Sequence, residues 1–106
     1  SLARKFVTTE RSIMNERDYS PMLIRTLLKA LVWQCPVIAY YKPRLKLHLH
    51  VYTLVVHDRC LYLSAKNVDT QEIETYALDY FESFACELGK RFEVPDSYQP
   101  TFEPCH

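Results

Sequence analysis

Hydrophobic and polar residues alternate along residues 45–56, and this alternation is the clearest structural signal in the chain. From Leu45 to Tyr52, the odd positions are leucine or valine and the even positions are lysine, histidine or tyrosine. Successive side chains of a strand point to opposite faces, so the pattern predicts a long strand with one buried and one wetter face. Residues 37–42 and 60–65 are predicted to be its neighbours. A loop of three to five residues is expected around 57–59, because the turn lacks an Asn-Gly or Asp-Gly pair.

Two stretches with apolar residues at helical spacing flank these strands. Leucine recurs at every fourth position between Leu23 and Leu31, after the helix-start signal Ser20-Pro21, so a helix is predicted from about residue 21 to 34. Residues 69–72 have the spacing of a capping box, and Gly89 is a suitable helix end. Between them lies a second apolar stripe, which predicts a second helix: Ile73, Ala77, Tyr80, Phe81, Phe84 and Leu88.

The order of these elements defines the predicted fold class. It is an α+β two-layer sandwich, in which a helix, a three-stranded antiparallel sheet and a second helix follow one another. The predicted organisation is an N-terminal arm over residues 1–19, a single α+β domain over 20–94 and an extended C-terminal tail over 95–106. Both helices must bury their stripes on one sheet face, so the other face is expected to remain uncovered by this chain.

Composition and charge restrict the function further. The chain has 106 residues, of which 48% are hydrophobic and 25% charged, as in a single globular domain. Its one glycine argues against a glycine-built phosphate loop. The net charge is zero, but residues 1–50 carry +6 and residues 51–106 carry −6. Either the two halves pair with each other or solvate their own surfaces, or the charge separation steers a partner.

The cysteines indicate a reducing compartment. Cys35, Cys60, Cys86 and Cys105 form no Cys-x-x-Cys pair, and the first three have apolar neighbours, as buried free thiols do. We therefore expect an intracellular protein, cytoplasmic or nuclear. No apolar stretch approaches the ~20 residues of a membrane span, and no signal peptide is visible. The abrupt ends suggest a domain cut from a longer protein.

The order of helix, three strands and helix over residues 21–89 resembles the architecture of the double-stranded-RNA-binding domain. That family binds phosphate through lysines at the start of its second helix, where this chain has Asp69, Glu72 and Glu74. The RNA-binding function of that family is therefore not carried over to this chain, and the resemblance leaves a non-binding, dimer-forming relative as the alternative. The same order is similar to the later part of longin domains of membrane-trafficking proteins, although the longin N-terminal hairpin is not evident in this sequence.

Two patterns suggest chemistry. His48 and His50 would lie side by side on one strand face, which suits zinc, and a third ligand would have to come from His57, Cys60 or His106. His57 and Cys60 also have the residue types of a cysteine nucleophile with its base. Two ligands make an incomplete metal site, and the thiol fits a core position. We therefore predict no enzyme activity, no resident metal and no cofactor.

The sheet face expected to stay open gives the leading functional prediction. It is a non-catalytic protein–protein interaction domain, an adaptor or a dimerisation domain, with a protein partner or a second copy on that face. The alternative is RNA binding, with phosphates held by Lys42, Arg44 and Lys46 and bases stacked on tyrosines. No small-molecule substrate is evident. The predicted contact residues are Tyr40, Lys42, Lys46, His48, His50, Tyr52 and Leu54.

Overall fold

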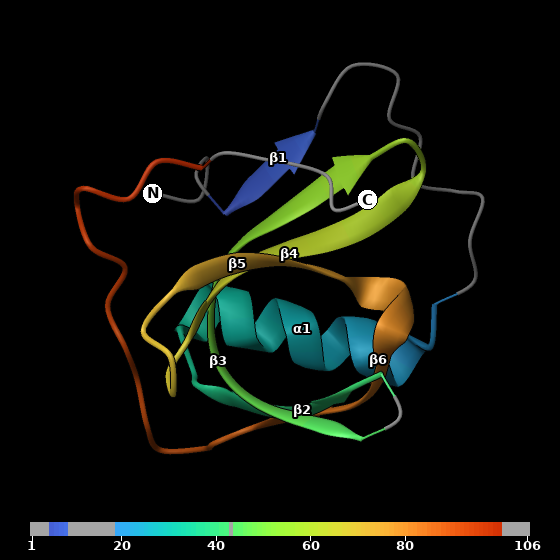
Figure 1. Ribbon diagram of the computed structural model, residues 1–106, viewed down its shortest axis with the longest axis horizontal. Coiled ribbons are helices and arrows are strands. Elements are labelled where there is room, and N and C mark those ends of the chain that lie inside the picture. Colours follow the sequence, from blue (N-terminus) through green and yellow to red (C-terminus); the bar gives the residue numbers. More distant parts are fainter. Residues whose placement is uncertain (1–4, 9–18, 43, 101–106) are drawn as a thin grey trace.

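The computed structural model describes residues 5–8, 19–42 and 44–100. In this part of the chain, one α-helix accompanies a strongly curved sheet (Figure 1). Five strands pair antiparallel in the order β5-β4-β3-β2-β6, and β1 pairs parallel with β3. The elements are β1 (Phe6–Thr8), α1 (Pro21–Trp33), β2 (Val37–Tyr41), β3 (Leu45–His57), β4 (Cys60–Asn67), β5 (Ile73–Ala77), the 3₁₀-helix η2 (Leu78–Tyr80) and β6 (Phe81–Cys86).

The predicted α-β-β-β-α sandwich is wrong, because residues 70–89 form no second α-helix. They form β5, the single turn η2 and β6 instead. The segment is rich in β-branched and aromatic residues, which fit a pleated sheet better than a helix. As strands, these residues place Tyr76 and Phe81 in the core. The similarity to double-stranded-RNA-binding and longin domains depended on that helix, so it does not hold either.

The apparent capping box at residues 69–72 lies in the turn between β4 and β5. The Asn67 side-chain oxygen accepts hydrogen bonds from the backbone N–H groups of Asp69 (2.9 Å) and Thr70 (3.2 Å). Gln71 then adopts a left-handed backbone conformation, with φ of 66°. Asparagine side chains stabilise turns in this way, so the polar cluster reverses the chain rather than starting a helix.

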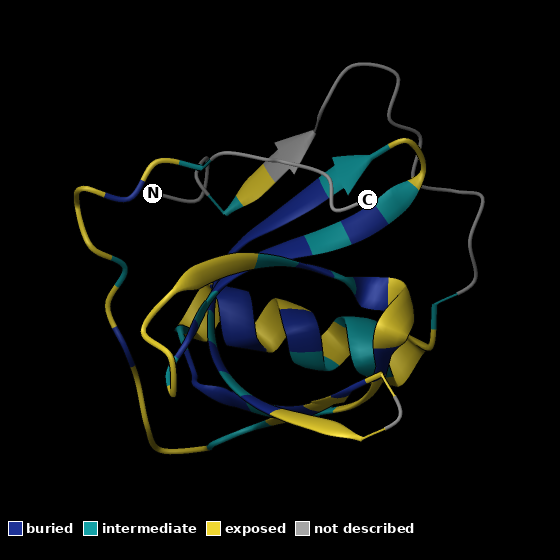
Figure 2. Ribbon diagram, viewed as in Figure 1, coloured by how far each residue is buried: buried dark blue, intermediate teal, exposed yellow. Residues whose placement is uncertain are grey.

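Helix α1 confirms the first predicted helix. The Ser20 hydroxyl accepts a hydrogen bond from Leu23 N, Pro21 occupies the first turn, and Gln34 ends the helix in a left-handed conformation. Its buried residues are Leu27, Ala30 and Leu31, which belong to the main hydrophobic core. Figure 2 shows buried positions on the helix and along the strands that surround it. The opposite side of α1 faces solvent.

A β-bulge in β3 changes which residues point inward. Val51 pairs with Ala65 and Thr53 with Ser64, so Tyr52 is an extra residue without a position in the ladder. A bulge of one residue exchanges the two faces of the strand beyond it. Leu54 consequently lies in the main core, 6% exposed. The prediction that Leu54 faces outward is therefore wrong.

The hairpin between β3 and β4 is tighter than predicted. His57 pairs directly with Cys60, so the loop contains only Asp58 and Arg59. Both have positive φ, 54° and 67°. Two central residues with positive φ define the turn geometry that best matches the twist of paired strands. The expected loop of three to five residues is wrong.

Candidate interaction surfaces

The segment after β6 covers part of the outer face of the sheet, as Figure 1 shows where the chain runs around its outside. Phe92 and Tyr98 lie on Tyr52, with ring centroids 5.9 Å and 4.9 Å from its ring. These three residues form a small hydrophobic cluster of their own. Tyr52 is only 2% exposed, so its side chain is not available to a partner.

A polar network fixes this covering segment to the sheet. The Tyr98 hydroxyl donates a hydrogen bond to Ser64 Oγ (2.9 Å) and lies 2.7 Å from Thr53 Oγ1. The Gln34 side chain donates to the Phe92 carbonyl (2.7 Å), and Phe92 N donates to the Gln34 carbonyl (3.0 Å). The segment is therefore tied both to the sheet and to the end of α1.

The seven predicted contact residues divide into three groups. Tyr40 (44% exposed), Lys42 and Lys46 are exposed. His48 and His50 are half-buried, whereas Tyr52 and Leu54 are buried. The open part of the outer face thus lies over β2 and the first half of β3.

Each of the two histidines interacts with a residue of another segment of this chain. His48 Nε2 lies 2.6 Å from Glu87 Oε1, and Lys90 Nζ lies 3.2 Å from Glu87 Oε2. The hydrogen bond to His48 lowers the pKa of Glu87, and Lys90 acts in the same direction. His50 stacks on Phe92, with centroids 4.3 Å apart and rings 3° from parallel. Burial lowers the pKa of His50, and Lys66 adds to the effect.

The described residues contain no group of three or more His, Cys, Asp or Glu side chains that could hold a metal ion. His106, one of the third ligands considered from the sequence, lies outside the described residues. Cys35, Cys60 and Cys86 are free thiols, the first buried and the others half-buried. Two further surface features of the described residues were not predicted from the sequence.

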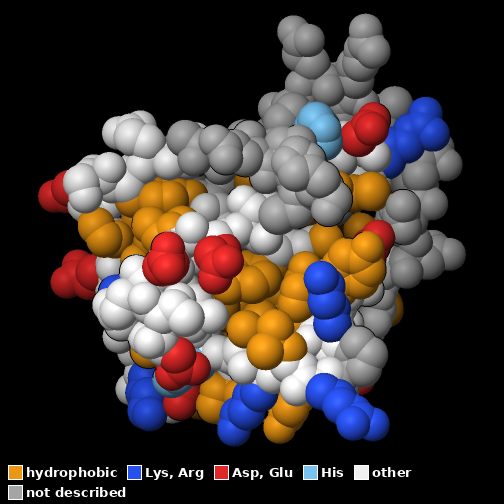
Figure 3. Space-filling model, viewed as in Figure 1, with side chains coloured by type: hydrophobic (Ala, Val, Ile, Leu, Met, Phe, Trp, Pro, Cys, Tyr) orange, Lys and Arg blue, Asp and Glu red, His pale blue; other side chains and the backbone are white. Residues whose placement is uncertain are grey.

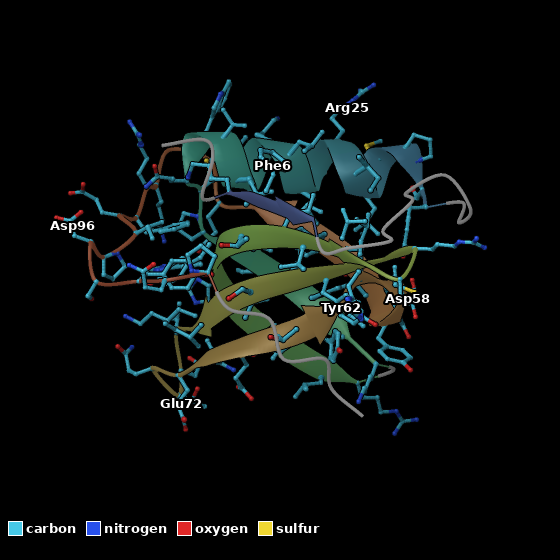
Figure 4. The ribbon with its side chains drawn as sticks, turned by 90° about the horizontal axis from the view of Figure 1, so that it is seen from above. Phe6, Arg25, Asp58, Tyr62, Glu72 and Asp96 are labelled. Carbon is cyan, nitrogen blue, oxygen red and sulfur yellow. The ribbon has the colours of Figure 1, made fainter. Side chains whose placement is uncertain are left out.

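The first missed surface is the outer side of α1. Met22, Val32 and Trp33 are exposed there, and Trp33 is 59% exposed. Arg25 and Lys29 lie between them in the helix, and Lys29 Nζ lies 5.9 Å from the centroid of the Trp33 ring. Figure 4 shows Arg25 pointing away from the sheet. Trp33 follows Lys29 by one helical turn in the sequence, and a tryptophan on the polar side of a helix is a signal for an interface.

A shallow hollow of about 330 Å³ adjoins Trp33. The end of α1 forms one side, and Gly89, Lys90 and Arg91 form the other. We define the Trp33 surface as this hollow together with the outer side of α1. Its exposed residues are Met22, Arg25, Lys29, Val32, Trp33, Lys90 and Arg91.

The second missed surface is a pocket of about 610 Å³ between the end of β2 and the β5–η2 segment. We call it the tyrosine pocket, because four tyrosines contribute to its lining. Figure 3 shows hydrophobic side chains across this part of the molecule, with cationic and acidic side chains around them. The pocket depends on β5 and η2, in a stretch for which the sequence pattern predicts a helix. Lining residues include Tyr41, Lys42, Glu74, Tyr76, Asp79 and Tyr80.

The fold defines a small, curved, mostly antiparallel β-sheet domain with one covering helix. No protein-family model matches the chain, and no curated protein matches it. Among solved structures, the proteasome accessory factor B/C (PafBC) of Arthrobacter aurescens has a similar fold, with a TM-score of 0.63 and 14% sequence identity. The similarity covers 82% of this chain but only 15% of the PafBC chain. At this identity it shows the fold alone.

Helix α1 is too short to cross a membrane, and no other helix in the described ranges is long and apolar enough to do so.

Proposed function

We propose that this chain is a non-catalytic protein–protein interaction domain that binds its partner through the Trp33 surface. The observation that supports the proposal is the exposure of Trp33 at the end of α1, with the exposed Val32 next to it in the sequence and the exposed Met22 in the first turn of the same helix. Tryptophan is enriched among residues that dominate binding energy, and grouped exposed apolar side chains mark interaction sites. The free thiols of Cys35, Cys60 and Cys86 support an intracellular location for this interaction.

The charge of the Trp33 surface favours an acidic partner. Helix α1 contains no aspartate or glutamate, and Arg25 and Lys29 are exposed on it. Lys90 and Arg91 add positive charge on the other side of the hollow. A partner segment with carboxylates around one apolar side chain would complement both the basic rim and the hollow. The positive N-terminal half of the sequence fits the same kind of partner.

The open part of the outer sheet face extends the proposed contact. Tyr40 and Lys46 are exposed there, and the neighbouring Ser83 and Ala85 of β6 are small and exposed. His48 lies at the edge of this region, beside Glu87. Because Lys90 also contacts Glu87, the two regions adjoin each other near the end of β6.

A photo-crosslinking amino acid at position 32 tests the proposal directly. In cells, we expect it to give a defined protein crosslink that disappears when Trp33→Ala is added. The matched control is the same crosslinker at position 73, because Ile73 is also exposed and apolar but lies on β5. Nuclease treatment should leave the crosslink unchanged. If position 32 gives no more crosslinks than position 73, the proposal is rejected.

RNA binding is the second candidate, and a different observation favours it. Lys42 and Arg44 are exposed at the turn between β2 and β3, and Lys46 is exposed at the start of β3. Cations grouped in this way can hold successive phosphates, and binding of that kind weakens steeply as salt increases. Titration of a single-stranded RNA at two salt concentrations checks this candidate, and binding without a salt dependence would exclude it.

A further inference from the structure

The tyrosine pocket already holds a positively charged group. Lys42 Nζ lies 5.5 Å from the centroid of the Tyr41 ring and 5.3 Å from that of Tyr80. The two rings are 6.0 Å apart and meet at 89°, so they form two perpendicular walls of a corner. Aromatic faces attract a cation within about 6 Å of the ring centroid. The Tyr41–Tyr80 corner therefore has the geometry of a cation site, which the chain fills with its own ammonium group.

Backbone hydrogen bonds fix both walls of this corner. Lys42 N donates to the Tyr80 carbonyl (2.7 Å), which holds the end of β2 against η2. Ala77 N donates to the Tyr41 hydroxyl (3.1 Å), so the Tyr41 ring also connects β2 to the end of β5. The Tyr76 ring packs edge-on against Tyr41, with centroids 5.3 Å apart. A ligand would meet a corner that is already ordered, which reduces the entropy lost on binding.

The charges that line the pocket favour a cation over an anion. Glu74 and Asp79 both contribute to the lining, against the single ammonium of Lys42. The Tyr76 hydroxyl donates to Glu74 Oε2 (3.3 Å), which keeps that carboxylate beside the rings. An anionic ligand would be repelled by the two nearby carboxylates. A cationic ligand would instead take the place of Lys42 and keep both carboxylates as counter-charges.

We propose that the tyrosine pocket binds a small organic cation of the quaternary-ammonium class, which displaces Lys42 from the Tyr41–Tyr80 corner. A methylated ammonium group is recognised by aromatic walls of this kind. The lysine ammonium is strongly hydrated and sits on a flexible stem. Lys42 is exposed, so its ammonium group can move into solvent. The pocket volume of about 610 Å³ falls within the range of small-molecule sites.

Nuclear magnetic resonance titration with choline chloride tests the proposal. We expect saturable shifts of the Tyr41 and Tyr80 ring resonances, which sodium chloride at equal ionic strength does not produce. The neutral control ligand is 3,3-dimethylbutan-1-ol, which has the shape of choline with carbon in place of nitrogen. It should bind at least several-fold more weakly. Equal binding of the two ligands would show a merely apolar pocket and overturn the proposal.

Variants separate the cation site from other kinds of pocket. Lys42→Gln removes the internal competitor and should strengthen choline binding roughly two- to fivefold. Tyr80→Phe keeps the ring and should retain binding, whereas Tyr80→Leu should lose it. Tyr40→Leu, an exposed tyrosine on the neighbouring outer face, is the control and should have no effect. If Lys42→Gln weakens choline binding, or if adenosine monophosphate shifts these resonances and choline does not, the proposal is wrong.

Discussion

Tyr98 and Thr53 are joined by a buried hydrogen bond of 2.7 Å, although 45 positions separate them in the sequence. Thr53 lies at the β-bulge of β3, and Tyr98 lies in the segment that covers the outer face of the sheet. Since the Tyr98 hydroxyl donates to Ser64 Oγ, it accepts from the Thr53 hydroxyl. One phenol group therefore links β3, β4 and the covering segment.

Removal of that hydroxyl should destabilise the fold. Tyr98→Phe keeps the ring but removes one hydrogen-bond partner from each of the buried hydroxyl groups of Thr53 and Ser64. Loss of a hydrogen bond to a buried polar group costs about 1–3 kcal/mol, and we expect a decrease of that size in the free energy of unfolding measured with urea. Tyr40→Phe, at an exposed position, should change it by less than about 0.5 kcal/mol. Equal stability of the Tyr98→Phe variant and the wild type would contradict this role.

The hairpin turn between β3 and β4 contains strain that a glycine would relieve. Arg59 has φ of 67°, a conformation that disfavours any residue with a Cβ atom. Arg59→Gly creates the preferred Asp-Gly turn and should stabilise the protein by about 0.5–1 kcal/mol in urea unfolding. Arg91→Gly is the control, since Arg91 is exposed and does not have positive φ. That change should be neutral or destabilising, and destabilisation by Arg59→Gly would refute the assignment of the turn.

Stability should decrease in mild acid because of His50. Burial lowers its pKa in the folded protein below the ordinary value of 6.5, so the unfolded chain binds a proton more readily. The stabilisation from a neutral, stacked His50 is present above pH 6.5. It is lost as the pH falls from 6.5 through the lowered pKa.

The measurement is the urea midpoint as a function of pH, from pH 8 down to 5. His50→Gln should flatten the decrease below pH 6.5, whereas His57→Gln, at the hairpin, should keep it. The contribution of Glu87 to the pH profile can be distinguished from that of His50. Because the pKa of Glu87 is lowered in the folded protein, the stability that its carboxylate adds is lost only as the pH falls below the ordinary carboxyl value of 4.5. An unchanged pH profile for His50→Gln would disprove the assignment.

The sequence predicted the first half of the fold well because its signals there were local. The Ser20-Pro21 start, the leucine spacing of α1 and the alternation in the first part of β3 each depend on neighbouring residues. The second half depended on tertiary context. Aromatic residues at helical spacing form β5 and β6, because pairing with β4 and β2 satisfies their backbone and buries Tyr76 and Phe81.

The candidate surfaces divide in the same way, into residues whose exposure local sequence predicts and residues whose position depends on tertiary contacts. The exposure of Tyr40 and Lys46 follows from local alternation in β2 and β3. The burial of Tyr52 does not, because it requires Phe92 and Tyr98 to return to β3. The tyrosine pocket required β2 and η2 to meet, and no local pattern predicts that contact.

The β-bulge gives the sharpest contrast between sequence pattern and structure. Simple alternation along β3 places Leu45 inside and Leu54 outside. In the structure Leu45 is 51% exposed, whereas Leu54 is 6% exposed and lies in the main core. Leu54→Ala should therefore lower the free energy of unfolding by about 2–5 kcal/mol, the usual result of removing a buried leucine side chain.

Leu45→Ala is the matched control, since it makes the same chemical change on the same strand. We expect it to change the stability by less than about 0.5 kcal/mol, because a half-exposed side chain at the start of the strand loses few contacts. Urea denaturation of the two variants side by side measures the difference. If Leu54→Ala is as mild as Leu45→Ala, Leu54 does not lie in the core and β3 runs without the bulge. In that case Tyr52 would return to the ladder, and the covering segment would lose the position at which Tyr98 holds it.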